Sequence, residues 1–264
     1  MSNADVENTT ATVGTDVIFE ARNLRKHFGG IRAVDGVSLK LFRNEIVGIV
    51  GDNGAGKSTL IKLISGVYRP DDGEMFLDGE DYVIQNAKDA KRLGVETVHQ
   101  NRGLVEVLNA PANMFLGRER VQPGIAGSVF RLLDKKYMRQ ETDDALKRLQ
   151  IRLRNMNSPV RVLSGGQQQS VSVGRAAYWK GKLVILDEPA NNLGVEEQEK
   201  VLHVIRELRS GSNITFILIS HNLEHVFDVS DRIIVMRNGM IAGERLTRDT
   251  TRNEIVSLIT GLSH

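Results

Sequence analysis

The stretch GDNGAGKST, residues 51–59, contains residue types whose spacing suits phosphate binding. It follows the apolar run EIVGIV and opens KSTLIKLISG, so an expected strand ends and an expected helix begins around it. Glycines let successive backbone N–H groups point into one concavity, and the helix N-terminus adds partial positive charge. We expect nucleotide contacts from Gly51, Asn53, Gly54, Ala55, Gly56, Lys57, Ser58 and Thr59. The pattern predicts a nucleoside triphosphate site.

Two side chains in this stretch have distinct expected roles. Lys57 can reach the β and γ phosphates, and the Ser58 hydroxyl can occupy one position around an octahedral Mg²⁺ ion. A glycine-rich turn with a solvated lysine is the alternative, and the flanking strand and helix argue against it.

A second stretch, LVILDEPANNLG at residues 183–194, ends an apolar run in two carboxylates. Ligands of parallel α/β folds collect at the carboxyl ends of the strands, so Asp187 and Glu188 should lie close to Lys57. Asp187 would hold Mg²⁺ through water, and Glu188 would act as general base on the attacking water. Taken alone, such a pair more often caps a helix or lies in a solvated turn.

Short β-branched runs alternate with helical patterns along the chain, which indicates a parallel sheet covered by helices. Strand-like segments at 17–28, 34–42 and 73–83 suggest a small antiparallel layer. A helix is expected from about Asp134 to Gln150, with a buried side formed by Tyr137, Met138, Ala145, Leu146 and Leu149. We interpret this region as a helical lobe inserted in the α/β core.

Composition limits the classes of function. The 264 residues are 41% apolar, enough for a substantial core, and the net charge of +2 is weak evidence for nucleic-acid binding. The absence of cysteine excludes disulfides, thiolate metal sites and cysteine nucleophiles. The apolar runs are shorter than the roughly 20 residues that a helix needs to cross a bilayer. Any membrane association should therefore be peripheral.

The segment LSGGQQQ, residues 163–169, precedes LVILDE, and this order resembles the ATP-binding subunit of ABC transporters from about Phe19 to Gly261. The resemblance implies an α/β fold: a P-loop NTPase core with a mostly parallel sheet, a small antiparallel β layer and an inserted helical subdomain at about 101–180. Residues 17–264 would form this ATPase domain after a disordered tail at 1–16. It also implies a head-to-tail dimer in which one subunit closes the ATP held by the other through Ser164, Gly165, Gly166 and Gln167.

Three further positions match the family. Phe28 matches the aromatic residue that stacks on adenine, with a core phenylalanine as the alternative. Gln100 matches the glutamine that reaches Mg²⁺ and the attacking water. His221 matches the switch histidine at the γ phosphate; a lone histidine after a strand is usually structural, but the run ITFILIS places it at the same sheet edge as Lys57.

The segments NAPANMFLGRE and SHNLEHVFDVSDRIIVMRNG resemble the branch that powers monosaccharide uptake in bacteria. The resemblance implies ATP and Mg²⁺ as cofactors and a position at the cytoplasmic face of the inner membrane. The implied partners are two transmembrane permease subunits, a second identical or paralogous ATPase subunit and, indirectly, an extracellular sugar-binding protein, with no nucleic acid. Phe115 and Leu116 lie where family members meet the coupling helices of the permeases.

One segment departs from the family. The usual Pro-Thr-Ser-Ala-Leu-Asp is replaced by Pro189 to Gly194, and Gly194 cannot supply the carboxylate through which the two sites sense each other. We expect an active ATPase with altered coupling between sites. The alternatives are a soluble ABC ATPase that acts on ribosomes or DNA and a nucleotide switch that does not hydrolyse ATP.

Overall fold

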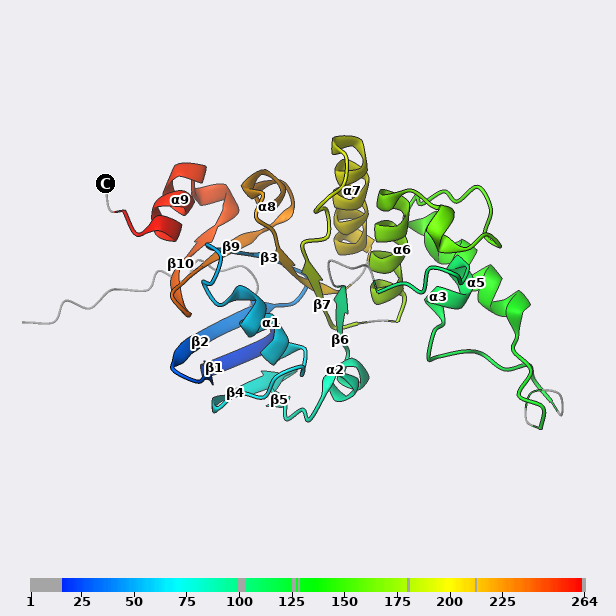
Figure 1. The fold of residues 1–264 in the computed structure, drawn as a ribbon, viewed down its shortest axis with the longest axis horizontal. Helices are drawn as coiled ribbons and strands as arrows, with labels where there is room; N and C mark the ends of the chain where they lie inside the picture. Colours follow the sequence, from blue (N-terminus) through cyan, green and yellow to red (C-terminus); the bar gives the residue numbers. More distant parts are fainter. Residues whose placement is uncertain are drawn as a thin grey trace, which may run out of the picture.

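The computed structural model describes residues 16–98, 103–124, 127, 129–179, 181–211 and 213–262. Two β-sheets form the left half of the view in Figure 1, and helices extend from them to the right. The larger sheet has the strand order β10-β9-β3-β8-β7-β6. Its strands are β3 (Ile46–Val50), β6 (Val95–Val98), β7 (Leu183–Asp187), β8 (Thr215–Ile219), β9 (Arg232–Arg237) and β10 (Met240–Leu246).

The larger sheet is mostly parallel, as predicted. Strand β3 pairs in parallel with β8 and β9, and β7 pairs in parallel with β6 and β8, while β10 is antiparallel to β9. Strands β3 and β8 are buried along their whole length. Both faces of these strands are covered, which explains why their sequences are continuous apolar runs.

The second sheet is the predicted antiparallel layer, with the order β2-β1-β4-β5. Its strands are β1 (Val17–Phe28), β2 (Ile31–Phe42), β4 (Asp72–Leu77) and β5 (Glu80–Asp81). Phe19 and Leu41 pair across β1 and β2 and are both fully buried. They belong to an apolar cluster that also contains Leu60 of α1 and Val47 of β3, so helix α1 is buried between the two sheets.

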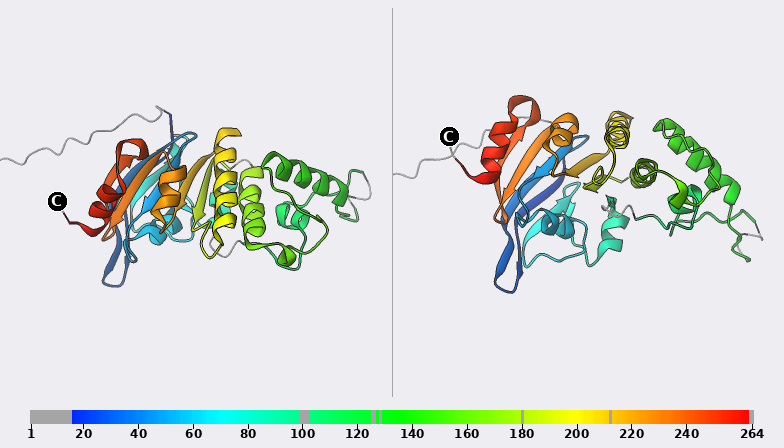
Figure 2. Two further views of the ribbon diagram at one scale, coloured as in Figure 1. Left: turned by 90° about the horizontal axis from the view of Figure 1, so that it is seen from above. Right: turned by 45° about the horizontal axis from the view of Figure 1, so that its top comes forward.

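Helices cover both faces of the larger sheet, as the two views of Figure 2 show. The helices of the described residues are α1 (Lys57–Ile64), α2 (Ala87–Leu93), α3 (Ala110–Met114), α5 (Lys135–Arg148), α6 (Gly165–Tyr178), α7 (Val195–Gly211), α8 (Leu223–Val229) and α9 (Arg252–Thr260), and short 3₁₀ turns lie at Val160–Val162 and Thr247–Asp249. Alternate residues of β8 face opposite clusters: Ile217 packs on the α1 side, and Phe216 packs with Val201 of α7.

Helices α3, α5 and α6 lie together at the end of the molecule farthest from β10. Phe115 is buried there and contacts the rings of Tyr137, Tyr178 and Trp179. Met138 is buried as expected, whereas the expectation for Tyr137 is wrong: its side chain is 40% exposed. Tyr137 packs on Phe115 from one side only and turns the rest of its ring toward Arg120 and solvent. The boundaries of the helical subdomain remain a prediction.

Candidate nucleotide site

The loop between β3 and α1 requires glycine at two positions. Gly51 has φ +149° and Gly56 has φ +103°, both in the region that side chains disfavour. A Cβ at Gly51 would lie 2.2 Å from the Met236 carbonyl oxygen, and one at Gly56 would lie 2.4 Å from the Ala33 carbonyl oxygen. The loop therefore curls tightly against β9 and β2, as the spacing of its glycines suggests.

Lys57 is buried at the first turn of α1. Its Nζ donates to the carbonyl oxygens of Gly51 at 2.6 Å and Asp52 at 2.9 Å. Burial lowers the pKa of Lys57, and the charges of Glu188, Asp52 and Asp187 oppose that change. The ammonium group is thus held over the loop and within electrostatic reach of both carboxylates from β7.

The N-terminus of α1 is open to an anion. Gly56 is the N-cap residue and provides no side-chain cap, so no side chain of the cap competes for the first N–H groups. Ser58 is exposed and Thr59 half-buried on the first turn, and Asn53 and Gly54 are exposed on the loop. Backbone donors and the two hydroxyls can therefore meet phosphate oxygens at this end of the helix.

The two carboxylates lie at the carboxyl end of β7. Asp187 is the last residue of this strand and pairs with Ile219 of β8. Glu188 has φ +53°, and its N–H donates to the Ile219 carbonyl oxygen at 3.0 Å. This left-handed conformation changes the direction of the chain immediately after the strand, and it sets the orientation of the Glu188 Cα–Cβ bond.

Glu188 and His221 face each other across the ends of β7 and β8. Glu188 Oε1 lies 3.2 Å from His221 Nε2, yet it is buried and accepts no hydrogen bond in the described part of the chain. Burial raises the pKa of Glu188, and the charge that His221 carries when protonated opposes the rise. The structure thus brings Lys57, Asp187, Glu188 and His221 to one edge of the sheet, and it leaves an acceptor suited to a water molecule.

The residues at this edge fit a magnesium ion that is bound mainly through phosphate and water. Among the described residues, no group of three or more histidines and carboxylates is placed to hold a metal. Mg²⁺ commonly takes only one or two protein ligands and completes its shell with substrate phosphates and water. A hydroxyl from Ser58 and a carboxylate from Asp187 provide such a donor set. Gln100, the third predicted ligand, lies outside the described residues.

Phe28 ends β1 with a face open to solvent. Its side chain is 42% exposed, and its ring makes an edge contact with Tyr68 at a centroid distance of 5.2 Å. Lys26 Nζ lies 5.7 Å from the centroid of the Phe28 ring. This environment differs from that of Phe19, which is fully buried, and it leaves an aromatic surface accessible to a planar base.

Replacing Phe28 by alanine should weaken ATP binding about fivefold, since aromatic stacking contributes about 1 kcal/mol. Titration of a fluorescent ATP analogue measures the change. The matched control is Phe76→Ala, a half-buried phenylalanine of β4 that packs under Arg22. Equal affinities for the Phe28 variant, the Phe76 variant and the unaltered chain would contradict the stacking role.

The serine-glycine segment forms a complete helix cap at the start of α6. Ser164 Oγ accepts from the Gln167 N–H at 3.3 Å, and Gln167 Oε1 accepts from the Ser164 N–H at 3.1 Å. Gln167 Nε2 also donates to the Arg152 carbonyl oxygen at 3.2 Å. A Cβ at Gly166 would lie 2.8 Å from Cβ of Glu197, so glycine permits the close approach of α6 and α7. In the described residues, no hydrogen bond or ion pair joins Ser164 or Gln167 to the phosphate loop.

The segment after Glu188 turns into α7 through polar residues. Asn192 has φ +59°, a conformation that asparagine tolerates better than most residues. The Gly194 carbonyl oxygen accepts from the N–H groups of Glu197 and Gln198, both at 2.9 Å. A Cβ at Gly194 would meet no atom within 4 Å. Sterics therefore do not demand glycine there, and an aspartate would fit.

Sequence reasoning did not identify Arg175 of α6. Its Nη1 donates to the Gly103 carbonyl oxygen at 2.9 Å, and burial lowers its pKa against the opposing charge of Glu96. This contact fixes the segment that follows residue 102 onto the helix that begins at Gly165. No spacing pattern could reveal it, because the two partners are 72 residues apart.

Comparison with known proteins identifies relatives over most of the chain. The family described as ABC transporter matches residues 34–191. The fructose import ATP-binding protein FrcA of Rhizobium meliloti is 42% identical over 92% of this chain and 94% of its own length. The xylose/arabinose import ATP-binding protein XylG of Sulfolobus acidocaldarius is 39% identical over 93% and 95%. The structure of MJ1267, an ATP-binding cassette of an ABC transporter, superimposes with a TM-score of 0.78 at 26% identity, covering 92% of this chain and 99% of that one.

Proposed function

Because the chain belongs to the ABC transporter family, we propose that it is the ATP-hydrolysing subunit of an importer whose cargo is a monosaccharide. The chain binds ATP and is an ATPase. Support for the cargo comes from the two relatives with names that specify fructose and xylose/arabinose import. The observation that supports hydrolysis most directly is the buried Glu188 Oε1, which lies 3.2 Å from His221 Nε2 and accepts no hydrogen bond among the described residues, at the sheet edge that carries Lys57.

Each residue at this edge has a role in phosphoryl transfer to water. The backbone of the loop and Lys57 hold and orient the phosphates, for which Lys57 exchanges its two carbonyl partners for phosphate oxygens. Glu188 accepts the proton of the attacking water, and His221 contacts the γ phosphate. Ser58, Asp187 and Gln100 would hold Mg²⁺, which when bound neutralises charge on the phosphates.

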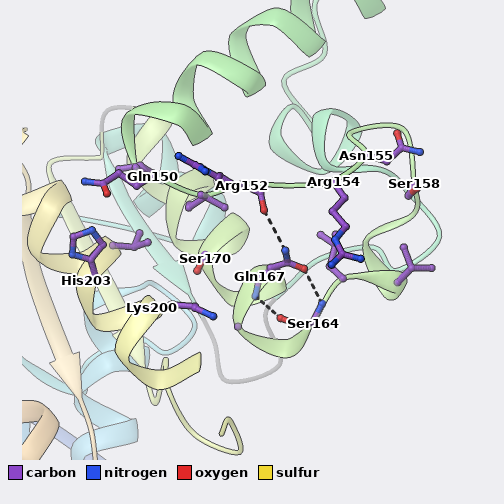
Figure 3. A pocket seen from close by; sticks show the side chains of 16 residues that line it. Gln150, Arg152, Arg154, Asn155, Ser158, Ser164, Gln167, Ser170, Lys200 and His203 are labelled. Atoms are coloured by element: carbon purple, nitrogen blue, oxygen red, sulfur yellow. Dashed lines mark hydrogen bonds between the residues drawn. The ribbon is translucent and has the colours of Figure 1, made fainter. Parts of the chain in front are cut away.

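The second half of the site comes from another subunit. Ser164, Gly165, Gly166 and Gln167 would meet the γ phosphate held by the partner's loop, so two copies, or this chain and a paralogue, would pair head to tail. Support comes from the start of α6, where Ser164 is exposed and caps the helix (Figure 3), so the partial positive charge of the helix N-terminus lies at the surface near that residue.

The variant Gly166→Ala should lower the ATPase rate at least tenfold while leaving ATP affinity unchanged. A Cβ there pushes against Cβ of Glu197, which moves the start of α6 away from the position that closes the partner's site. Steady-state hydrolysis and ATP titration separate the two effects. The control is Gly194→Ala, where the added methyl meets open space. An equal loss of ATP affinity in Gly166→Ala would show that the change acts through the subunit's own site instead.

The partners that we propose are two membrane-spanning permeases and, through them, an extracellular sugar-binding protein. In the described residues, no helix is long and apolar enough to cross a membrane. Contact with these permeases would hold the chain at the cytoplasmic face. Residues 17–264 would form the ATPase domain after a tail at 1–16, with the helical subdomain at about 101–180. Phe115 is buried and Leu116 is 39% exposed, so Leu116 is the residue of this pair that can touch a permease.

Uptake of labelled sugar tests the proposal. Cells that express only the Glu188→Gln chain should lose uptake of a monosaccharide, tested with fructose, xylose and ribose, while cells with the unaltered chain retain it. The tagged chain should also purify from detergent extracts with membrane-spanning subunits and without RNA or DNA. Unchanged uptake of all three sugars, together with recovery on ribosomes, would contradict the import function and favour the ribosomal alternative.

A further inference from the structure

A second aromatic residue, Tyr68, contacts the ring of Phe28. The two ring centroids lie 5.2 Å apart at an interplanar angle of 65°, an edge geometry that aromatic pairs favour. Phe28 is the last residue of β1, and Tyr68 lies four residues beyond the end of α1. Phe28 keeps 42% of its side chain exposed, whereas Tyr68 is half-buried and packs against the core cluster that contains Leu60. The better-buried ring therefore supports the more exposed one.

Tyr68 is itself restrained by the end of α1. Its backbone N–H donates to the Lys62 carbonyl oxygen at 2.9 Å, and Lys62 Nζ lies 5.3 Å from the centroid of its ring. Gly66 has φ +74° between these residues, and a Cβ there would lie 2.8 Å from the Asn86 carbonyl oxygen. The glycine turn and the two contacts with Lys62 together restrict the position of Tyr68.

The residues that follow Tyr68 bind the end of β1. The Asp71 N–H donates to the Arg25 carbonyl oxygen at 2.8 Å. The Asp71 carboxylate accepts from the His27 N–H at 2.7 Å and from Lys26 Nζ at 2.6 Å. The strand that ends in Phe28 is thus fixed to the segment that carries Tyr68 by contacts that do not involve the two rings.

The aromatic pair is connected to the phosphate loop through two elements. Helix α1, which Tyr68 follows, begins at Lys57 of that loop. Strand β2 pairs with β1 and carries Ala33, whose carbonyl oxygen would lie 2.4 Å from a Cβ at Gly56. The surface for the base and the loop for the phosphates therefore belong to one packed part of the fold.

The contact with Tyr68 should matter because Phe28 lies at the surface. An exposed side chain changes rotamer on a picosecond to nanosecond timescale. Ordering such a side chain only when a ligand binds lowers the affinity by roughly two- to tenfold. A ring that already packs against Tyr68 has lost part of this freedom before the nucleotide arrives, so the contact should increase the affinity for ATP.

We propose that Tyr68 is a positioning residue for the nucleotide base, because it holds the ring of Phe28 in the orientation on which the base stacks. The proposal rests on the stacking role of Phe28 within the function proposed above. It requires the ring of Tyr68 and not the hydroxyl, so phenylalanine should replace this tyrosine without loss.

Calorimetric titration of the full-length chain with ATP and Mg²⁺ tests the proposal in a Glu188→Gln background, which slows hydrolysis. Tyr68→Leu and Tyr68→Met remove the ring and should each weaken ATP binding about threefold, whereas Tyr68→Phe should not. When Phe28→Ala is already present, adding Tyr68→Leu should have no further effect, since Tyr68 acts through the Phe28 ring. The matched control is Tyr137→Leu, which removes a tyrosine of α5 that also packs edge-on against a phenylalanine, Phe115, and should leave ATP affinity unchanged. Thermal unfolding verifies that each variant is folded.

Three results would overturn the proposal. Unchanged affinity in Tyr68→Leu and Tyr68→Met, with the loss in Phe28→Ala intact, shows that Phe28 stacks without help and leaves its stacking role standing. An equal loss from Tyr68→Leu with and without the Phe28 ring shows a general structural effect. A loss in Tyr68→Phe as large as that in Tyr68→Leu assigns the effect to the hydroxyl. Unchanged affinity in Phe28→Ala itself would instead contradict the stacking role on which the proposal rests.

Discussion

Glu188→Gln should lower the rate of ATP hydrolysis by a factor of about 10²–10⁴, the usual contribution of a positioned general base, while ATP binding persists. Glutamine keeps the size of the side chain and removes the atom that accepts the proton. Burial raises the pKa of Glu188, which brings the carboxylate closer to the proton affinity that a base needs near neutral pH. Steady-state release of phosphate and titration of a fluorescent ATP analogue measure the two properties.

The matched control for this variant is Glu199→Gln, which changes an exposed carboxylate on α7 and should leave the rate unchanged. Light scattering during size-exclusion chromatography adds an independent result, because blocked hydrolysis should trap a closed dimer in the presence of ATP and Mg²⁺. Hydrolysis at the unaltered rate in Glu188→Gln would mean that another group acts as base. A persistent monomer with ATP bound would mean that closure needs the permeases or a paralogous subunit.

Local pattern predicted the phosphate loop because its requirements are local. The spacing of Gly51 and Gly56 follows from a backbone that must curl around an anion, and a strand before and a helix after it complete the signal. The atoms that exclude a side chain at these positions belong to Ala33 and Met236, from other strands. Which atoms contact the loop depends on the tertiary fold, so the sequence of the loop alone could not predict these contacts.

For the two carboxylates too, the sequence predicts their place on a strand, whereas their conformation depends on the tertiary fold. An apolar run that ends in Asp187 and Glu188 places both at the end of a parallel strand, which the structure bears out. The left-handed conformation of Glu188 depends on its bond to Ile219 of the neighbouring strand. Helical periodicity likewise assigned Tyr137 to a buried side, but only the shape of the Phe115 cluster determines how much of that ring is covered. Periodicity predicts which side of a helix faces the core, but it does not predict the exposed fraction of each side chain.

Arg232→Met should reduce the free energy of unfolding by about 3–5 kcal/mol, the cost of leaving a buried charge without its partner. Arg232 and Glu45 are both buried, and Arg232 Nη2 lies 2.8 Å from Glu45 Oε1. The same nitrogen donates to the Lys40 carbonyl oxygen at 2.6 Å, and Nη1 bonds Glu244. The side chain therefore ties β9 to β2 and to the residue that precedes β3, the strand that carries the phosphate loop.

The loss in Arg232→Met should shrink as the pH falls. Burial raises the pKa of Glu45, and the charge of Arg232 opposes that rise, so removing the arginine raises the pKa further. A carboxyl whose pKa is higher in the folded protein than in the unfolded one binds more protons when folded, so stability increases toward acid as the group is neutralised. Urea unfolding of the variant and the unaltered chain at pH 8 and pH 5.5 should give a smaller difference at the lower pH.

Two further variants show whether the lost stability arises from an unpaired buried charge. Arg232→Met combined with Glu45→Leu removes both charges and should recover most of the loss, because no buried carboxylate then lacks a partner. Arg252→Gln breaks an exposed ion pair with Glu224 and should change the unfolding free energy by less than about 1 kcal/mol. If the single Arg232 variant and the double variant lose the same stability, the deficit comes from packing against Phe42, whose ring centroid lies 5.0 Å from the Arg232 guanidinium carbon, and not from Glu45.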